Sequence, residues 1–196
     1  MSAAAGTSVC LGLGSNQGDR LAELRRAVAG LAGLAGVEVV ARSRVWETEH
    51  VGAGEQDPYL NACVEVLTDL APLALLEALK QLEAAAGRLA DGHLRPRPID
   101  LDILLWGDQV ISEGRLRVPH PEMRRRAFVL EPLAEIAAGR LVPDSGETIA
   151  EACAKIRRKA GPWVRLHDGR GRWDAGPGCE QGGPGCCPGA TSSSKA

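Results

Sequence analysis

Hydrophobic and polar positions follow two different periods along the chain. Four segments show the two-residue alternation or the continuous apolar character of β-strands. Two segments between them repeat apolar residues every three or four positions, as amphipathic helices do. The predicted strands are residues 7–14, 37–48, 59–68 and 99–105, and the predicted helices run from Asp19 to Leu34 and from Pro72 to near Gly87.

The order strand, helix, strand, strand, helix, strand predicts an α+β fold with a ferredoxin-like βαββαβ core. In this arrangement, two helices cover one face of a four-stranded antiparallel sheet. We therefore expect the opposite face of the sheet to be free for a ligand.

The C-terminal third adds smaller elements to this core. Residues 108–126 predict short edge strands and turns, and residues 127–137 predict a last helix that Pro132 breaks near its start. From residue 168 the chain is rich in Gly, Pro, Ser and Cys and has almost no aliphatic side chains. Such a segment cannot bury enough apolar surface to fold. We expect one domain over residues 1–167 and a disordered tail over residues 168–196.

The last core strand carries two carboxylates, which strands rarely contain. Ile99, Leu101 and Ile103 form its apolar face, whereas Asp100 and Asp102 repel each other about 6.6 Å apart on the other face. Two carboxylates on one face supply the oxygen ligands that Mg²⁺ prefers. A solvated edge strand is the alternative interpretation.

Basic residues beside this pair favour the metal interpretation. Arg95 and Arg97 immediately precede the aspartates, and Pro96 and Pro98 stiffen the backbone between them. Phosphoryl transfer depends on positioning and charge neutralisation, so metal-binding carboxylates next to phosphate-binding arginines suit that chemistry. The glycines of GLGSNQGDR do not match a dinucleotide fingerprint or a Walker loop, and they predict a tight turn.

Five further residues are candidates for a small-molecule site. Glu83 interrupts the apolar stripe of the second predicted helix, where a carboxylate is costly, so it is either a buried residue paired with an arginine or part of the site. Tyr59 and Phe128 are the single residues of their types. They are either core residues or rings that stack on a flat heterocycle, whose edge Asn61 would read. His120, in the turn VPHP, suits a rigid phosphate contact.

Composition restricts the classes of partner. The net charge of −2 over 196 residues gives no reason to expect a nucleic acid, and no apolar run reaches the roughly 18 residues of a membrane span. The spacing of the cysteines matches no metal site, and we expect Cys10, Cys63 and Cys153 to be reduced core residues. A cytoplasmic monomer that binds small molecules is the expectation.

Taken together, these motifs resemble the 6-hydroxymethyl-7,8-dihydropterin pyrophosphokinases, folate-pathway enzymes that transfer pyrophosphate from ATP to a pterin alcohol and release AMP. The resemblance covers about residues 8–150, and PRPIDLDILL followed by VPHP is its most specific part. The matching segments, in order, are LGLGSNQGD, VWET, DPYLNA, LEAAAGR, RPRPIDLDILLWG and LRVPHPEMRRRAFVLEPLAEIA.

The resemblance also implies a role for individual residues. It implies two Mg²⁺ ions on Asp100 and Asp102, ATP as co-substrate, and catalytic phosphate contacts from Arg88 and Arg97. No general base is evident. The implied ATP contacts are Glu83, Arg88, Arg97, Arg115, His120 and Arg126, and the implied pterin contacts are Thr48, Tyr59, Asn61 and Phe128.

Two alternatives remain open at this point. Ferredoxin-like sheets also serve as noncatalytic small-molecule sensors and RNA-binding modules, so the fold alone does not decide the function. An RNA-binding sheet presents several aromatic rings and a basic face, whereas this chain offers paired aspartates and few rings. A second enzyme could keep the same site and use another flat heterocyclic alcohol as acceptor.

Overall fold

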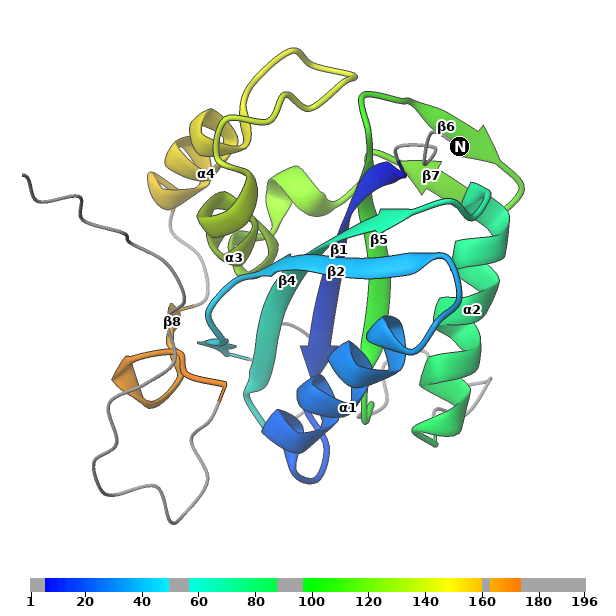
Figure 1. The fold of residues 1–196 in the computed structure, drawn as a ribbon. Helices are drawn as coiled ribbons and strands as arrows, with labels where there is room; N and C mark the ends of the chain where they lie inside the picture. Colours follow the sequence, from blue (N-terminus) through cyan, green and yellow to red (C-terminus); the bar gives the residue numbers. More distant parts are fainter. Residues whose placement is uncertain (1–5, 50–56, 88–96, 160–162, 174–196) are drawn as a thin grey trace, which may run out of the picture.

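The computed structural model describes residues 6–49, 57–87, 97–159 and 163–173 (Figure 1). The core elements are β1 (Thr7–Ser15), α1 (Arg20–Ala32), β2 (Val37–Arg42), β3 (Trp46–Thr48), β4 (Tyr59–Thr68), α2 (Pro72–Ala85) and β5 (Asp100–Trp106). They are followed by β6 (Ile111–Glu113), β7 (Leu116–Val118), α3 (Ala127–Ala137), α4 (Ile149–Arg157) and β8 (Val164–Leu166), with short 3-10 turns at Met123–Arg125 and His167–Gly169.

The main sheet confirms the ferredoxin-like core and extends it. Its strands run in the order β5-β1-β4-β3-β8, β2 also pairs with β4, and all of these pairings are antiparallel. The described sheet therefore has six strands, two more than the four that we predict from the sequence. One extra strand arises because the predicted strand 37–48 divides into β2 and β3, and the other is β8.

The division between β2 and β3 has a local cause at Ser43. Ser43 N donates to the Cys63 carbonyl oxygen at 2.9 Å, and Cys63 N donates to Ser43 Oγ at 2.9 Å. A side chain thus replaces a backbone acceptor, which interrupts the regular ladder. The prediction of one continuous strand is wrong for this reason.

Helices α1 and α2 cover one face of the sheet, as the periodicity predicts (Figure 1). Asp19 caps α1 by accepting a hydrogen bond from Ala22 N at 3.0 Å, and Pro72 is the first residue of α2. The fully buried side chains between these helices and the sheet include Leu11, Leu24, Leu31, Leu75, Leu79 and Leu101.

The opposite face of the sheet is partly covered, which corrects the expectation of a free face. Helices α3 and α4 pack there on a second apolar cluster that includes Cys10, Cys63, Leu104, Leu130 and Leu133. The three described cysteines Cys10, Cys63 and Cys153 are buried and free, as predicted.

Two predictions about the helices of this layer are wrong. Pro132 does not break α3, which continues from Ala127 to Ala137, because buried Leu130 and Leu133 hold its two halves on the sheet. The segment 127–137 is also not the last helix, since α4 follows it. A capping box at the start of α4, formed by Thr148 and Glu151, is a sequence signal for this helix.

Residues beyond the predicted domain boundary at 167 also contact the sheet. Val45 N donates to the Gly171 carbonyl oxygen at 2.8 Å, and Trp173 Nε1 donates to the Ser43 carbonyl oxygen at 2.6 Å. Residues 168–173 therefore pack beside β3, while residues 174–196 of the predicted tail lie outside the described residues. None of the described helices has the length and apolar character needed to span a membrane.

Candidate active site

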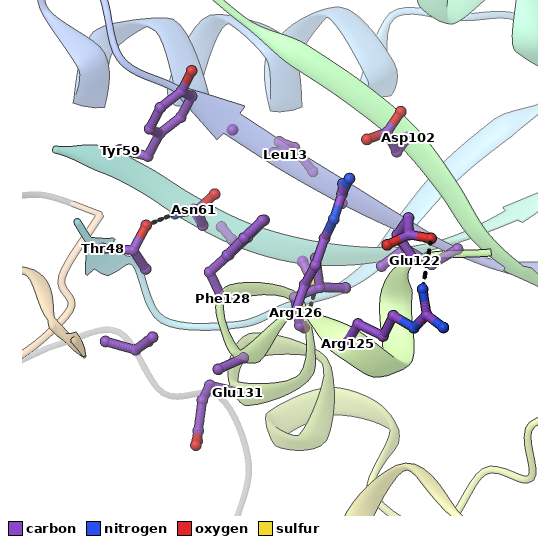
Figure 2. Close-up of a pocket in the computed structure, with 18 of the residues that line it drawn as sticks. Leu13, Thr48, Tyr59, Asn61, Asp102, Glu122, Arg125, Arg126, Phe128 and Glu131 are labelled. Carbon is purple, nitrogen blue, oxygen red and sulfur yellow. Dashed lines mark hydrogen bonds and ion pairs between the residues drawn. The ribbon is translucent and has the colours of Figure 1, made fainter. Parts of the chain in front are cut away.

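A cavity of about 960 Å³ opens beside α3 and α4, over the part of this sheet face that they do not cover. Figure 2 shows side chains from β1, β4 and β5 on one side of it and from the start of α3 on the other. The predicted site residues that line this cavity are Thr48, Tyr59, Asn61, Arg97, Asp100, Asp102, His120, Arg126 and Phe128. Arg88 and Arg95 lie outside the described residues.

Two glycines on β1 form part of the cavity floor. Gly14 pairs with Asn61 on β4 and with Asp100 on β5, and Gly12 pairs with Asp102. A Cβ atom on Gly14 would lie 3.3 Å from Asn61 Oδ1. Because adjacent strands are about 4.8 Å apart, the amide of Asn61 and the aspartates lie roughly two strand spacings apart, with no side chain between them. The sequence prediction of a tight turn does not assign these glycines to the cavity floor. Glycines within a strand, as in the run G-L-G, are a signal that something approaches the backbone closely.

Asp100 and Asp102 lie on the same face of β5 and both line the cavity. Burial raises the pKa of Asp102, and the nearby charge of Asp100 raises it further, while His120, Lys80 and Arg126 act in the opposite direction. A cation bound between the two carboxylates would relieve the repulsion between them.

The donor set fits Mg²⁺ that is only partly coordinated by protein. No group of three or more His, Cys, Asp or Glu side chains with metal-ligand geometry occurs in the described ranges. Two carboxylates without further protein ligands suit an ion that also takes oxygens from phosphate groups and water, as Mg²⁺ does. Asp100 and Asp102 could hold such an ion.

Arg97 is held beside the aspartates from two directions. Its Nη1 donates to Asp100 Oδ2 at 2.8 Å. Its backbone N donates to Asn16 Oδ1 at 2.8 Å, and Asn16 N donates to the Arg97 carbonyl oxygen at 3.3 Å. Asn16 is 2% exposed and follows β1, so the turn GSNQG fixes the backbone of Arg97. The sequence prediction does not assign this role to Asn16.

The polar end of the cavity near β3 brings together the four predicted pterin contacts. Asn61 Nδ2 donates to Thr48 Oγ1 at 3.0 Å, and both side chains are buried. Tyr59 lies opposite Thr48 in the β3–β4 register, and burial raises the pKa of its phenol. In Figure 2, the Phe128 ring lies between Asn61 and Arg126. The two rings and the amide line one cavity, as a site for a flat polar heterocycle requires.

His120 faces the same cavity as Asp102. Its backbone N donates to the Leu104 carbonyl oxygen at 3.0 Å, and its Nδ1 accepts a hydrogen bond from Glu122 N at 3.2 Å. Burial lowers the pKa of the imidazole, although the charge of Asp102 opposes this shift. Because Nδ1 acts as an acceptor, Nε2 is the nitrogen that carries the proton in the neutral ring.

Arg126 extends from the start of α3 into the cavity, between Phe128 and Asp102 in Figure 2. Its guanidinium carbon lies 5.8 Å from the centre of the Phe128 ring, within the range of a cation–π contact. The cation thus lies between the aromatic end and the carboxylate end of the cavity.

Two predicted ATP contacts do not line the cavity. Glu83 is 1% exposed, and it accepts hydrogen bonds from Leu101 N at 2.8 Å and from Lys80 Nζ at 2.9 Å. Arg115 lies in the turn between β6 and β7, where its Nη2 is 2.9 Å from Glu77 Oε2 and both side chains are exposed. Their predicted contacts with ATP stay predictions.

The wall formed by α3 and α4 contains charged residues that the sequence prediction missed. Glu131 is 8% exposed and lines the cavity, and its Oε1 accepts a hydrogen bond from Arg157 Nε at 2.6 Å. Glu122, Arg125 and Lys159 also line the cavity. The run MRRR indicates positive charge near the site, but the contribution of α4 depends on tertiary packing.

Comparison with known proteins gives consistent results. The model of the family described as 7,8-dihydro-6-hydroxymethylpterin-pyrophosphokinase (HPPK) matches residues 10–138. A 2-amino-4-hydroxy-6-hydroxymethyldihydropteridine pyrophosphokinase of Methylorubrum extorquens is 47% identical over 150 residues, which cover 76% of this chain and 94% of the relative. The protein of that name in Bacillus subtilis is 43% identical over 152 residues, which cover 77% of this chain and 91% of the relative.

A solved structure shows a similar fold at low sequence identity. The crystal structure of Plasmodium falciparum HPPK-DHPS with pteroate matches with a TM-score of 0.61 and 13% identity over 76% of this chain and 44% of that chain. This chain therefore spans less than half of that solved protein. The likeness supports the fold of the domain.

Proposed function

The chain belongs to the 7,8-dihydro-6-hydroxymethylpterin-pyrophosphokinase family, and on this basis we propose how its cavity binds the two substrates of that reaction. The protein is a pyrophosphokinase of folate biosynthesis: it transfers pyrophosphate from ATP to the hydroxyl of 6-hydroxymethyl-7,8-dihydropterin and releases AMP. The family uses Mg-ATP. The assignment of roles to the residues of this chain is our proposal.

The pterin occupies the end of the cavity near β3. Tyr59 and Phe128 contact its two faces, and the buried Asn61 and Thr48 hydrogen-bond its edge. This placement is supported by the Asn61–Thr48 hydrogen bond, which fixes the amide before substrate arrives. When the plane of the pterin ring is fixed, its hydroxymethyl group points in a defined direction. Such positioning can lower the activation barrier by several kcal/mol.

The triphosphate of ATP occupies the end of the cavity near β5. Asp100 and Asp102 would hold two Mg²⁺ ions, which would supply positive charge to the phosphate oxygens. Arg97 lies at the edge of this site and offsets charge on the transferred group, together with Arg88. His120 donates from Nε2 to a phosphate oxygen, and Arg126 adds a positive charge between the two substrates.

The reaction is a single displacement at phosphorus. The hydroxymethyl oxygen of the pterin forms a bond to the β-phosphorus, the bond from that phosphorus to the oxygen of AMP breaks, and the hydroxyl proton leaves to solvent. The arginines of the chain position the phosphates and compensate their charge, and the aspartates would hold the metal ions that do the same, which is the main requirement of phosphoryl transfer. No described side chain is assigned as a general base.

One observation carries this proposal: the paired aspartates and the aromatic residues line the same cavity across two glycines of β1. The noncatalytic alternatives receive no support from the fold. An RNA-binding module needs an open sheet face, whereas α3 and α4 pack on part of this one.

The test is the release of AMP from ATP and Mg²⁺ with and without the hydroxymethyl dihydropterin. We expect AMP release that depends on both the pterin and Mg²⁺, and Arg97→Ala should lower kcat while the pterin Kd stays near the wild-type value. AMP release with another heterocyclic alcohol but not with the pterin would favour the alternative acceptor. Release without Mg²⁺ would contradict the role of the aspartates.

A further inference from the structure

Arg20 occupies a position that helix formation does not explain. It is the first residue of α1, where a positive charge opposes the helix dipole, and Asp19 already caps this end of the helix. Its side chain is nevertheless only 24% exposed, because it contacts Glu47 on β3 and the carbonyl oxygen of Pro58.

The contacts of Arg20 join two neighbouring strands. Its Nη1 donates to Glu47 Oε1 at 3.3 Å and also to the carbonyl oxygen of Pro58. Glu47 immediately precedes Thr48, and Pro58 immediately precedes Tyr59. Since Thr48 and Tyr59 pair directly across β3 and β4, one guanidinium ties the two strands where both reach the cavity.

Glu47 is held from its other side by β8. Arg165 donates to Glu47 Oε2 from Nη2 at 2.7 Å and from Nε at 3.2 Å. Burial raises the pKa of Glu47, but the hydrogen bond from Arg165 and the charges of Arg20, Arg165 and His167 outweigh it, so the pKa lies below its usual value. Glu47 is therefore ionised, and two cations compensate its charge.

These contacts matter because β3 is short. It has three residues, so few backbone hydrogen bonds fix its position relative to β4. Its last residue, Thr48, accepts the hydrogen bond from Asn61. A small shift of β3 would move Thr48 and release the amide of Asn61 from its fixed orientation.

We propose that Arg20 and Glu47 form a clamp that positions the pterin contacts Thr48, Asn61 and Tyr59. The inference rests on the proposed pterin site. Neither Arg20 nor Glu47 lines the cavity, so both are positioning residues that act through β3 and β4. The clamp lies at the β3 end of the cavity, away from Asp100 and Asp102, and it therefore affects pterin binding more than ATP binding.

The test compares Arg20→Met with the control Arg26→Met in the full-length enzyme. Arg26 belongs to the same helix but pairs with Glu23 on its exposed side. We expect Arg20→Met to raise the KM and Kd for hydroxymethyl dihydropterin about tenfold, as the loss of a charge-assisted hydrogen bond implies, with the ATP KM within about twofold of wild type. Arg26→Met should match wild type in all three constants.

Two further variants separate positioning from a general loss of structure. Arg20→Lys should restore part of the pterin affinity because a lysine can still pair with Glu47. Glu47→Gln should weaken pterin binding and should add little to the effect of Arg20→Met in the double variant, since both remove the same contact. Glu47→Gln also tests the clamp if Arg20→Met does not fold.

Wild-type pterin affinity in both Arg20→Met and Glu47→Gln would overturn the inference, as would equal losses of pterin and ATP affinity. Asn61→Ala, measured in parallel, separates this failure from failure of the proposed site. If Asn61→Ala binds the pterin as wild type does, the site is wrong. If Asn61→Ala loses affinity while the clamp variants do not, the site stands and only the clamp is wrong.

Discussion

Carboxylates lie against both faces of β5, and their surroundings differ: Glu83 of α2 lies on one side and Asp102 of β5 itself on the other. Toward α2, the buried Glu83 accepts hydrogen bonds from Leu101 N and Lys80 Nζ. Toward the cavity, burial and the charge of Asp100 raise the pKa of Asp102. Glu83 is thus paired with donors of the protein, whereas Asp102 is buried beside a second carboxylate.

This difference separates residues that hold the fold from residues that hold a ligand. A buried acceptor that is fully paired stabilises the protein, and removing it leaves donors without partners. A carboxylate with a raised pKa costs stability in its charged form, so folding does not account for its presence. This difference is what we expect if the cavity face of β5 binds a metal ion.

Asp102→Asn should show the largest effect, and it should appear in catalysis. Loss of a metal-binding carboxylate removes charge stabilisation of the reacting phosphates, and we expect kcat/KM to fall by about 10³-fold. Steady-state AMP release and thermal denaturation of the same protein samples measure this. A loss of folding stability that accounts for the lost activity would break the comparison between the two faces.

Phe128→Ala should act on the cavity face and change substrate binding. Stacking of a flat ring on an aromatic side chain contributes about 1–3 kcal/mol, so the pterin Kd should rise by roughly tenfold or more. Direct titration with the pterin at fixed Mg²⁺ and a nonhydrolysable ATP analogue measures this change. An unchanged pterin Kd would mean that Phe128 is a packing residue, the alternative that its sequence position leaves open.

Glu83→Ala should act on the other face and lower the free energy of unfolding. It leaves the buried Leu101 N–H without its acceptor, which costs about 1–3 kcal/mol. The matched control is Glu83→Gln, whose side-chain oxygen can still accept the hydrogen bond from Leu101 N, so it should cost less than Glu83→Ala. Urea denaturation compares the two. An ATP KM that rises while stability is unchanged would instead support the predicted ATP contact of Glu83.

The smallest expected effect concerns the pH dependence of folding stability. It tests the same contrast between the two faces of β5. The folded-state pKa of Asp102 lies above the ordinary value of 3.8, so the folded state binds more protons than the unfolded state between the two values. The contribution of Asp102 to stability therefore falls as pH rises through this interval. In EDTA, Asp102→Asn should be more stable than wild type at neutral pH, and the difference should disappear near pH 3. Thermal melts at several pH values test this, and equal curves would contradict the shift.

Local patterns were sufficient to predict the core and many of the residues that line the cavity. Asp100, Asp102 and His120 belong to short motifs whose chemistry can be read from neighbouring residues. The helix that begins at Arg20 is capped by Asp19, the helix that begins at Pro72 has proline as its first residue, and both have apolar stripes. These features depend on residues close together in sequence, so no tertiary structure is needed to find them.

The remaining features depend on contacts between distant segments. The break at Ser43 requires Cys63 as a partner, and β8 forms only by pairing with β3. The wall from α4 and the contact of Arg20 with Pro58 likewise join residues far apart in the chain. A pattern of local periodicity does not contain such pairings, although the capping box at Thr148 does indicate α4.

The most direct test of the central claim is Mg²⁺-dependent binding of a nonhydrolysable ATP analogue to wild type and Asp102→Asn. The account predicts that Mg²⁺ strengthens nucleotide binding to wild type and has little effect on the variant, while both proteins remain folded. Equal enhancement by Mg²⁺ in the two proteins would show that this aspartate does not hold the ion, and would contradict the functional assignment of this face of β5.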